Sequence, residues 1–209
     1  MTDMTEGHPT VDTEVWSDLF FRVIAETDEG PVSIRLTFQF DLMKISGVVD
    51  KESGISANEI AKQKLASSFF TFLTAFLGKC NRVRHVNEDV GCTSIFHCSD
   101  FHILAGDNGY MNGVFDGEVV TDKQKFIESF NVDADPIPMK KGTIFALNLG
   151  NNRFSNLFGI ALKDIPYSIN IPIYGRVAPD SMGDLDRVFN LIGTTLGTPK
   201  WPTILRNDE

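Results

Sequence analysis

The sequence predicts a single, mainly β domain that also contains two α-helices. The chain has 209 residues, 42% of them hydrophobic and 22% charged, which suits one soluble domain with a sizeable core. Apolar and polar residues alternate from Val32 to Phe40, the period of a strand with one buried face. A capping box at Ser56, followed by an apolar stripe, indicates that a helix follows these strands.

The first part of the chain predicts a tail and then a hairpin. Residues 1–18 are polar and acidic and are expected to form a flexible tail, which leaves residues 19–209 as the domain. Segments 20–25 and 32–40 are predicted strands, and the turn between them is expected at residues 28–31.

A helix is predicted over residues 56–77. Ser56 can accept a hydrogen bond from the third amide of the helix, and Glu59 can return one to the Ser56 amide. Gly78 is expected to end the helix in a left-handed conformation. An apolar stripe predicts that this helix plugs one end of a barrel, through Leu65, Phe69, Phe72, Leu73 and Phe76.

The second half of the chain alternates short apolar runs with turns. A strand and turn are predicted at 95–104, strands at 143–149, 157–162 and 171–177, and a second helix at 181–192 with Ser181 as its cap. The glycine-rich segment from Gly106 to Gly117 lacks the ending of a phosphate-binding loop, so surface turns are expected there. Seventeen phenylalanines predict a core built largely from aromatic packing.

Composition argues against several classes of function. The net charge of −9 and the pI near 4.9 argue against nucleic-acid binding, which depends on clustered Lys and Arg. The longest apolar segment, residues 65–77, is shorter than the roughly 20 residues that span a bilayer, so no membrane partner is expected. Cys80, Cys92 and Cys98 form no evident disulfide framework, which favours a reducing, intracellular and cytoplasmic location. No motif calls for a cofactor or metal.

Several motifs, in order along residues 20–204, resemble the cyclophilins, a family of peptidyl-prolyl cis-trans isomerases. The resembling segments are the hairpin at 20–36, Phe96-His97, Gly106-Asp107, Tyr174-Gly175-Arg176-Val177, the helix at 182–188, and the last loop with Gly193, Thr194, Gly197 and Pro199. The resemblance implies an eight-stranded antiparallel β-barrel closed by two α-helices, those at 56–77 and 181–192.

The resemblance also implies an impaired catalytic site. The family uses an arginine that hydrogen-bonds the proline nitrogen and a glutamine that holds the peptide. Cys98 stands where the arginine would be and Leu104 where the glutamine would be, and the chain between them is two residues shorter than in the family. A thiol is a weak donor and leucine is none, so no catalytic residue is assigned. Replacing Cys98 by Arg and Leu104 by Gln is expected to restore part of the activity.

The substrate pocket is carried over position by position. The expected pocket residues are Phe96, His97, Phe101, His102, Asn148, Asn156, Phe158 and Tyr167.

Three other arrangements of the site were weighed. Arg82, Arg84 or Arg153 could supply the missing cation. Zinc is a second alternative, because Cys92, His97, Cys98 and His102 are zinc-ligand types, although neighbouring strand residues point to opposite faces. A nucleophilic Cys98 beside His97 is the third, and the same divergence of side chains argues against it.

The resemblance therefore implies a domain that binds protein or proline-containing segments with weak or absent isomerase activity. One alternative is an active peptidyl-prolyl isomerase with a rearranged site. The other is a structural subunit that uses the barrel as a docking block in a larger assembly.

Overall fold

The computed structural model describes residues 16–41, 54, 56–76, 92–106, 114–115, 118–119, 130–134, 137–169 and 171–208. Its helical elements are α2 (Ala57–Thr71), the π-helical turn η4 (Phe72–Phe76), the 3₁₀ turn η6 (Pro179–Ser181) and α3 (Met182–Ile192). Its strands are β1 (Trp16–Thr27), β2 (Gly30–Asp41), β3 (Cys92–Ser94), β4 (His97–Cys98), β5 (His102–Ala105), β6 (Val114–Phe115), β7 (Glu118–Val119), β8 (Phe130–Asn131), β9 (Ile137–Met139), β10 (Thr143–Ala146), β11 (Arg153–Phe154), β12 (Phe158–Ala161), β13 (Ile165–Ile169), β14 (Ile173–Val177) and β15 (Thr203–Asn207).

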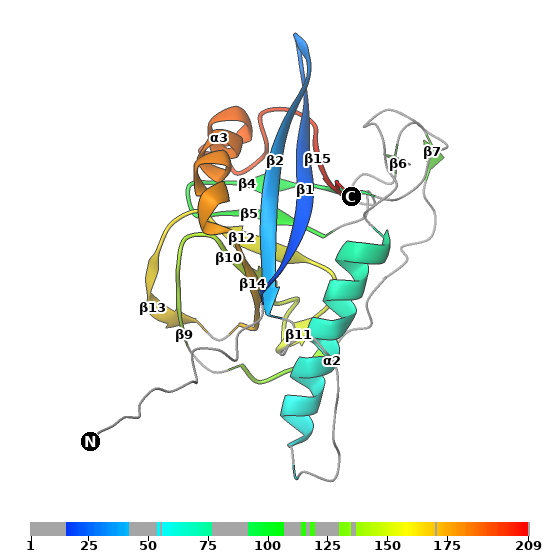
Figure 1. Cartoon of the computed structure of the whole chain (residues 1–209), viewed down its shortest axis with the longest axis vertical. Helices are drawn as coiled ribbons and strands as arrows, with labels where there is room; N and C mark the ends of the chain where they lie inside the picture. The colour runs from blue at the N-terminus through cyan, green and yellow to red at the C-terminus, as the bar shows by residue number, and fades with distance from the viewer. Residues whose placement is uncertain are drawn as a thin grey trace, which may run out of the picture.

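The main sheet is antiparallel and curled, and the buried residues of both helices belong to the single main core that it encloses (Figure 1). Its nine strands follow the order β3-β15-β1-β2-β14-β10-β12-β5-β4. The two edge strands, β3 and β4, are consecutive in the chain. Between them, the Ile95 amide donates to Thr203 of β15 and the Phe96 amide donates to Leu104 of β5. One extended run therefore joins both edges, and counting it once gives the predicted eight strands.

The β1–β2 hairpin confirms the first predicted strand pair. The partners Thr27 and Gly30 enclose a turn of Asp28 and Glu29, so Pro31 belongs to β2 and not to the predicted turn. Gly30 has a φ of +110°, a conformation that glycine adopts without steric cost. The strand begins earlier than expected, because residues 16–18 of the predicted tail pair with the end of β2. Residues 1–15 lie outside the described part of the chain.

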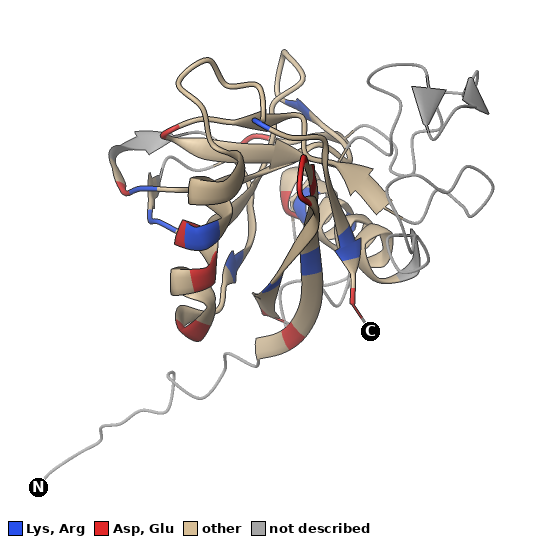
Figure 2. Cartoon of the chain, turned by 90° about the horizontal axis from the view of Figure 1, so that it is seen from above, with Lys and Arg blue, Asp and Glu red and all other residues tan. Residues whose placement is uncertain are grey.

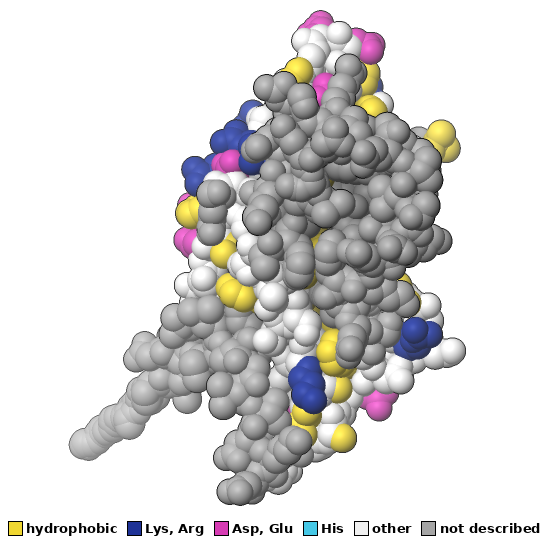
Figure 3. All heavy atoms as spheres, turned by 90° about the vertical axis from the view of Figure 1, so that its right-hand side faces the viewer, with side chains coloured by type: hydrophobic (Ala, Val, Ile, Leu, Met, Phe, Trp, Pro, Cys, Tyr) yellow, Lys and Arg dark blue, Asp and Glu magenta, His cyan; other side chains and the backbone are white. Residues whose placement is uncertain are grey.

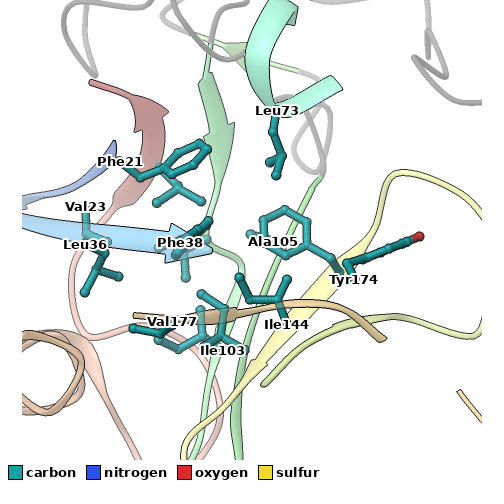
Figure 4. Packing of buried hydrophobic residues seen from close by; sticks show 14 of the residues in the cluster. Phe21, Val23, Leu36, Phe38, Leu73, Ile103, Ala105, Ile144, Tyr174 and Val177 are labelled. Atoms are coloured by element: carbon teal, nitrogen blue, oxygen red, sulfur yellow. The ribbon is translucent and has the colours of Figure 1, made fainter. Parts of the chain in front are cut away.

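Phenylalanines supply seven of the eleven largest fully buried side chains of the described core, and they pack among aliphatic residues (Figure 4). Alternate residues of β2, from Ile34 to Phe40, are buried, whereas Val32, on the same face near the hairpin tip, is exposed. Phe69 of α2 lies at the centre of this packing. Its ring stacks on Tyr174 with centroids 3.9 Å apart and meets the edge of Phe158 at 5.1 Å. Such contacts add about 0.5–1.5 kcal/mol per pair to the free energy of burial.

The first helix forms where the sequence predicts it. Ser56 is its N-cap, and the Ser56 Oγ accepts from the Glu59 amide at 3.2 Å. The Glu59 carboxylate pairs with Lys62 at 3.2 Å. The apolar stripe faces the core through its buried members, which are Leu65, Phe69, Phe72 and Leu73. The helix widens to a π turn from Phe72, and Asn207 donates its side-chain amide to the Leu73 carbonyl there.

The second helix begins differently from the prediction. Ser181 makes no side-chain cap, and its Oγ instead accepts from the Thr37 amide of β2 at 3.0 Å. A 3₁₀ turn with Pro179 at its start leads into α3. Tertiary contact thus takes the hydroxyl that the local pattern assigned to the helix. The side of α3 facing the core carries Leu185, Val188 and Ile192.

Several predictions lie outside the described residues. These are the cap at Gly78, the cations Arg82 and Arg84, and most of the glycine-rich segment. Among the helices that the structure describes, none is long and apolar enough to cross a membrane.

Candidate functional site

The predicted active-site strand and turn form the β4–β5 hairpin. His97 pairs with Leu104 and Cys98 with Ile103. The tight turn between the strands is closed by the Ser99 amide, which donates to the His102 carbonyl at 3.0 Å. On its other side β5 pairs with β12, and β12 in turn pairs with β10. Four adjacent strands, β4, β5, β12 and β10, therefore form one wall of the curled sheet.

Successive residues of the hairpin point to opposite faces of this wall. Cys98, Ile103 and Ala105 belong to the main core, whereas His97 and His102 are only partly buried. Cys98 is completely buried, and desolvation, with a smaller contribution from the charge of Asp100, raises the pKa of its thiol to about 12. Cys98 is therefore a neutral core residue at physiological pH.

The outer face of the wall carries an aromatic row. The rings of His97 and His102 stack with centroids 5.0 Å apart, and His102 meets Phe145 edge-on at 6.2 Å. Leu104 is partly buried and packs against a small apolar cluster formed by Met139, Phe145 and Ala161. We call His97, His102, Leu104 and Phe145 the outer-face row. It combines two imidazoles with apolar surface.

Phe101 extends this surface at the hairpin turn. Its side chain is 54% exposed, unusual for a large apolar residue, and the Lys163 ammonium lies 4.6 Å from its ring centroid. A small hollow of about 200 Å³ lies beside the turn, lined by Asp100, Leu162, Lys163, Asp186 and Phe189.

The other predicted pocket residues are dispersed. Phe158 is fully buried against Phe69, so it does not face the outer surface. Asn156 is buried and donates to the Gly106 carbonyl at 3.0 Å. Asn148 is exposed and accepts from the Gly150 amide at 2.8 Å, which places it in a turn. Phe96 is partly buried between β3 and β4, and the side chain of Tyr167 lies outside the described part.

The zinc and nucleophile alternatives gain no support from the geometry. The described residues contain no group of three or more His, Cys, Asp or Glu that could hold a metal ion. Cys98 faces the core while His97 faces outward, and Cys92 packs in a separate cluster with Ile24 and Ile204. The raised pKa of Cys98 also keeps its thiol protonated, which is unfavourable for a nucleophile.

Comparison with known proteins separates sequence from structure. No protein-family model matches the chain, and no curated protein sequence matches it significantly. Among solved structures, a cyclophilin-type peptidyl-prolyl cis-trans isomerase from Cryptosporidium parvum matches 91% of this chain and 96% of its own, with a TM-score of 0.51 and 15% identity. The same protein in the presence of the dipeptide Ala-Pro matches 90% of this chain and 99% of its own, with a TM-score of 0.47 and 14% identity.

This chain has a cyclophilin-like fold. The predicted fold class, a mainly β curled antiparallel sheet with two helices, is confirmed. At this level of identity the likeness establishes the fold, while the chemistry depends on the residues of the outer face.

The position predicted for the degenerate arginine faces the core. Cys98 was aligned with the arginine of the cyclophilins, but its side chain points into the core. The neighbouring His97 faces outward, directly opposite Leu104. A shift of one residue moves a strand side chain to the other face of its sheet. In this cyclophilin-like wall, the polar outward residue opposite Leu104 is an imidazole.

Phe145 is a member of the outer-face row that the sequence prediction missed. It lies in the predicted strand 143–149, where four consecutive buried residues hide the alternation of faces. The adjacent Gly159 is the signal that could have found it. A side chain at Gly159 would meet the Phe145 ring at 2.2 Å, so the glycine makes room for that ring on the outer face.

We expect His102 to make stability depend on pH. Burial and then the nearby His97 lower the pKa of His102 in the folded state, so the unfolded chain binds the proton more tightly. Stability should therefore be unaffected by this group above about pH 7 and fall as pH drops through about 6.5, the unfolded value. Urea unfolding measures this effect. Between pH 7.5 and pH 5, the free energy of unfolding should fall less for His102→Gln than for the native protein. Equal losses would contradict this role.

Proposed function

We propose that this chain is a cyclophilin-like domain that binds protein segments, including proline-containing ones, and that its prolyl isomerase activity is weak or absent. One observation carries the second half of the proposal. The four strands of the outer wall, β4, β5, β10 and β12, contain no lysine or arginine. Stabilising a twisted amide requires a donor that binds the transition state better than the planar ground states.

The described residues offer few substitutes for that cation. Arg153 lies on β11, which pairs with β8 in a separate two-stranded sheet. His102, whose ring stacks on His97, has a lowered pKa and is therefore neutral at physiological pH. A neutral imidazole can donate one hydrogen bond, but it lacks the fixed charge of a guanidinium.

The outer-face row and Phe101 support the binding half of the proposal. His97, His102 and Leu104 are partly exposed, Phe145 is buried beneath them, and Phe101 is exposed. Together they form largely apolar surface, which suits a proline ring and its flanking residues. A cavity of about 450 Å³ lies elsewhere, between Trp16, Lys140, Tyr174, Arg176 and Met182. None of the predicted pocket residues lines it.

We expect an Ala-Ala-Pro-Phe peptide to bind this face more tightly than an Ala-Ala-Ala-Phe peptide. Phe101→Ala should weaken binding of the proline peptide at least about fivefold, because it removes exposed apolar surface with little effect on the core. Val32→Ala, an exposed apolar residue near the tip of the β1–β2 hairpin, is the matched control. NMR titration of the labelled chain gives both the affinity and the face that binds.

Two outcomes would contradict the proposal. If neither peptide binds, the barrel serves as a docking block with no peptide site. If Val32→Ala weakens binding as much as Phe101→Ala, the peptide does not occupy the outer face.

A working isomerase with a rearranged site is the second candidate, and Lys163 is the observation that favours it. Its ammonium lies over the exposed Phe101 ring at the edge of the outer face. The ammonium could reach a bound peptide from there.

A further inference from the structure

Three arginines form a row across neighbouring strands of the sheet, far in sequence from the β4–β5 hairpin. Arg22 of β1 is directly opposite Arg206 of β15 on one side and Arg35 of β2 on the other. Directly paired residues of antiparallel strands project from the same face. We call these three residues the arginine row. Figure 2 shows basic segments on adjacent strands close to the C-terminus.

A single described carboxylate lies within this row. Asp208 accepts from Arg22 in a two-pronged contact, Nε to Oδ1 at 3.0 Å and Nη2 to Oδ2 at 3.0 Å. The other two arginines lie farther from this carboxylate. The Arg35 Nε is 3.8 Å from Oδ2, and the Arg206 Nη2 is 3.7 Å from Oδ1. The hydrogen bond from Arg22, and then the charges of the three arginines, lower the pKa of Asp208 against the opposing effect of burial. The carboxylate therefore remains ionised at physiological pH.

The row keeps donors that the described residues do not use. Arg22 also donates to the Ser33 hydroxyl at 3.1 Å, which fixes its guanidinium. Arg35 lies over the Phe20 ring at 4.3 Å and is half exposed, so its fork is oriented but open. The buried Nε of Arg206 has no hydrogen-bond partner in the described part of the chain. Basic and acidic side chains also gather at the upper left of the face in Figure 3.

Among the residues that the structure describes, the charge of the row is unbalanced. Three guanidinium groups contribute +3 and Asp208 contributes −1, so the described groups sum to +2, in a chain whose net charge is −9. Like charges directly opposite on adjacent strands destabilise a sheet. A dianion would remove that repulsion and would use the open donors.

We propose that the arginine row is a binding site for a phosphate monoester. A phosphate monoester carries about −1.5 to −2 charges at pH 7 and three acceptor oxygens, which matches the uncompensated charge. The planar guanidinium of Arg35, which is half exposed, suits a two-pronged contact with phosphate oxygens. The Ser33 hydroxyl adds a further donor at the rim. This site is independent of the outer-face row, so it stands whether or not that face binds proline segments.

The phosphate can come from a phosphorylated side chain or from a small free phosphate, and the test distinguishes these. The full chain is titrated with inorganic phosphate, with a phosphoserine peptide and with its unphosphorylated twin, by calorimetry and by NMR of the arginine Nε–H groups. We expect the phosphoserine peptide to bind and its twin not to bind. Equal affinity for inorganic phosphate would identify a small phosphate as the ligand, with the site itself upheld.

Two substitutions should change phosphate affinity in opposite directions. Arg35→Gln should weaken binding at least about tenfold, since it removes a half-exposed fork with little structural role. Asp208→Asn should tighten binding about threefold or more, because it removes the resident negative charge, even though it loosens β15 and lowers the melting temperature. A purely structural role for the row predicts lower stability in Asp208→Asn without any gain in affinity.

Arg187→Gln is the matched control, because Arg187 is an exposed arginine that pairs with Asp184 on α3. It should leave phosphate binding unchanged. The proposal is overturned if neither phosphate probe shifts the Nε–H signals of the row, if Arg187→Gln weakens binding as much as Arg35→Gln, or if Asp208→Asn binds phosphate no better than the native chain.

Discussion

The purified protein is expected to accelerate cis-to-trans conversion of a Xaa-Pro peptide at less than about one hundredth of the rate of an ordinary cyclophilin. Loss of one preorganised donor to the transition state costs about 3 kcal/mol, or roughly a hundredfold in rate. The outer wall lacks a lysine or arginine on its four strands, and Leu104 cannot hydrogen-bond a peptide backbone. A protease-coupled assay or NMR exchange on the same peptide measures the rate, with an active cyclophilin as the reference.

A rate typical of the family would contradict this prediction and would support the rearranged site. Lys163→Met then decides whether the cation over Phe101 is responsible. If Lys163 supplies the missing charge, that variant should lose the activity while its binding of the proline peptide persists. Lys200→Met is a suitable control, because Lys200 also lies over an aromatic ring, that of Trp201, outside the outer wall.

Cys98→Arg is expected to unfold the protein instead of restoring catalysis. Cys98 is completely buried in the main core, so the substitution places an unpaired guanidinium among apolar side chains. An uncompensated buried charge costs about 3–5 kcal/mol or more, a large part of the 5–15 kcal/mol that stabilises a typical domain. The partial recovery predicted from the sequence for Cys98→Arg with Leu104→Gln is therefore no longer expected.

Urea unfolding of three variants measures this effect. Cys98→Ala should cost far less than Cys98→Arg, because it leaves a small cavity and no charge. His97→Arg should stay folded, since His97 is only partly buried and faces outward beside His102. Any gain in isomerase rate should appear in His97→Arg. Native-like stability of Cys98→Arg would show that β4 presents its other face to the core.

The fold was largely predictable because its signals are local. Alternation in β2, the Ser56 cap and the stripe of Leu65 and Phe69 each depend on residues a few positions apart. Each of these features has the predicted position in the structure. The prediction for Ser181 was wrong, because the Thr37 amide, 144 residues away in sequence, takes its hydroxyl.

The candidate site was less predictable, because it depends on which face each strand turns to the core. Motif matching placed Cys98, Phe101 and Phe158 in one pocket. The structure turns Cys98 and Phe158 inward and leaves Phe101 exposed. No motif predicted that Phe145 belongs to the site, where its ring packs against Gly159.

The sequence by itself determined the class of fold, the main strands, both helices and the aromatic character of the core. These follow from periodicity, capping and composition, which act over short distances along the chain. Only the tertiary structure decided which face of β4 is buried and which amide the Ser181 hydroxyl accepts from. It also decided that Arg22, Arg35 and Arg206 lie in one row. The physical reason is strand register. A side chain changes faces with a shift of one residue, and register is fixed by the packing of distant strands and not by local sequence.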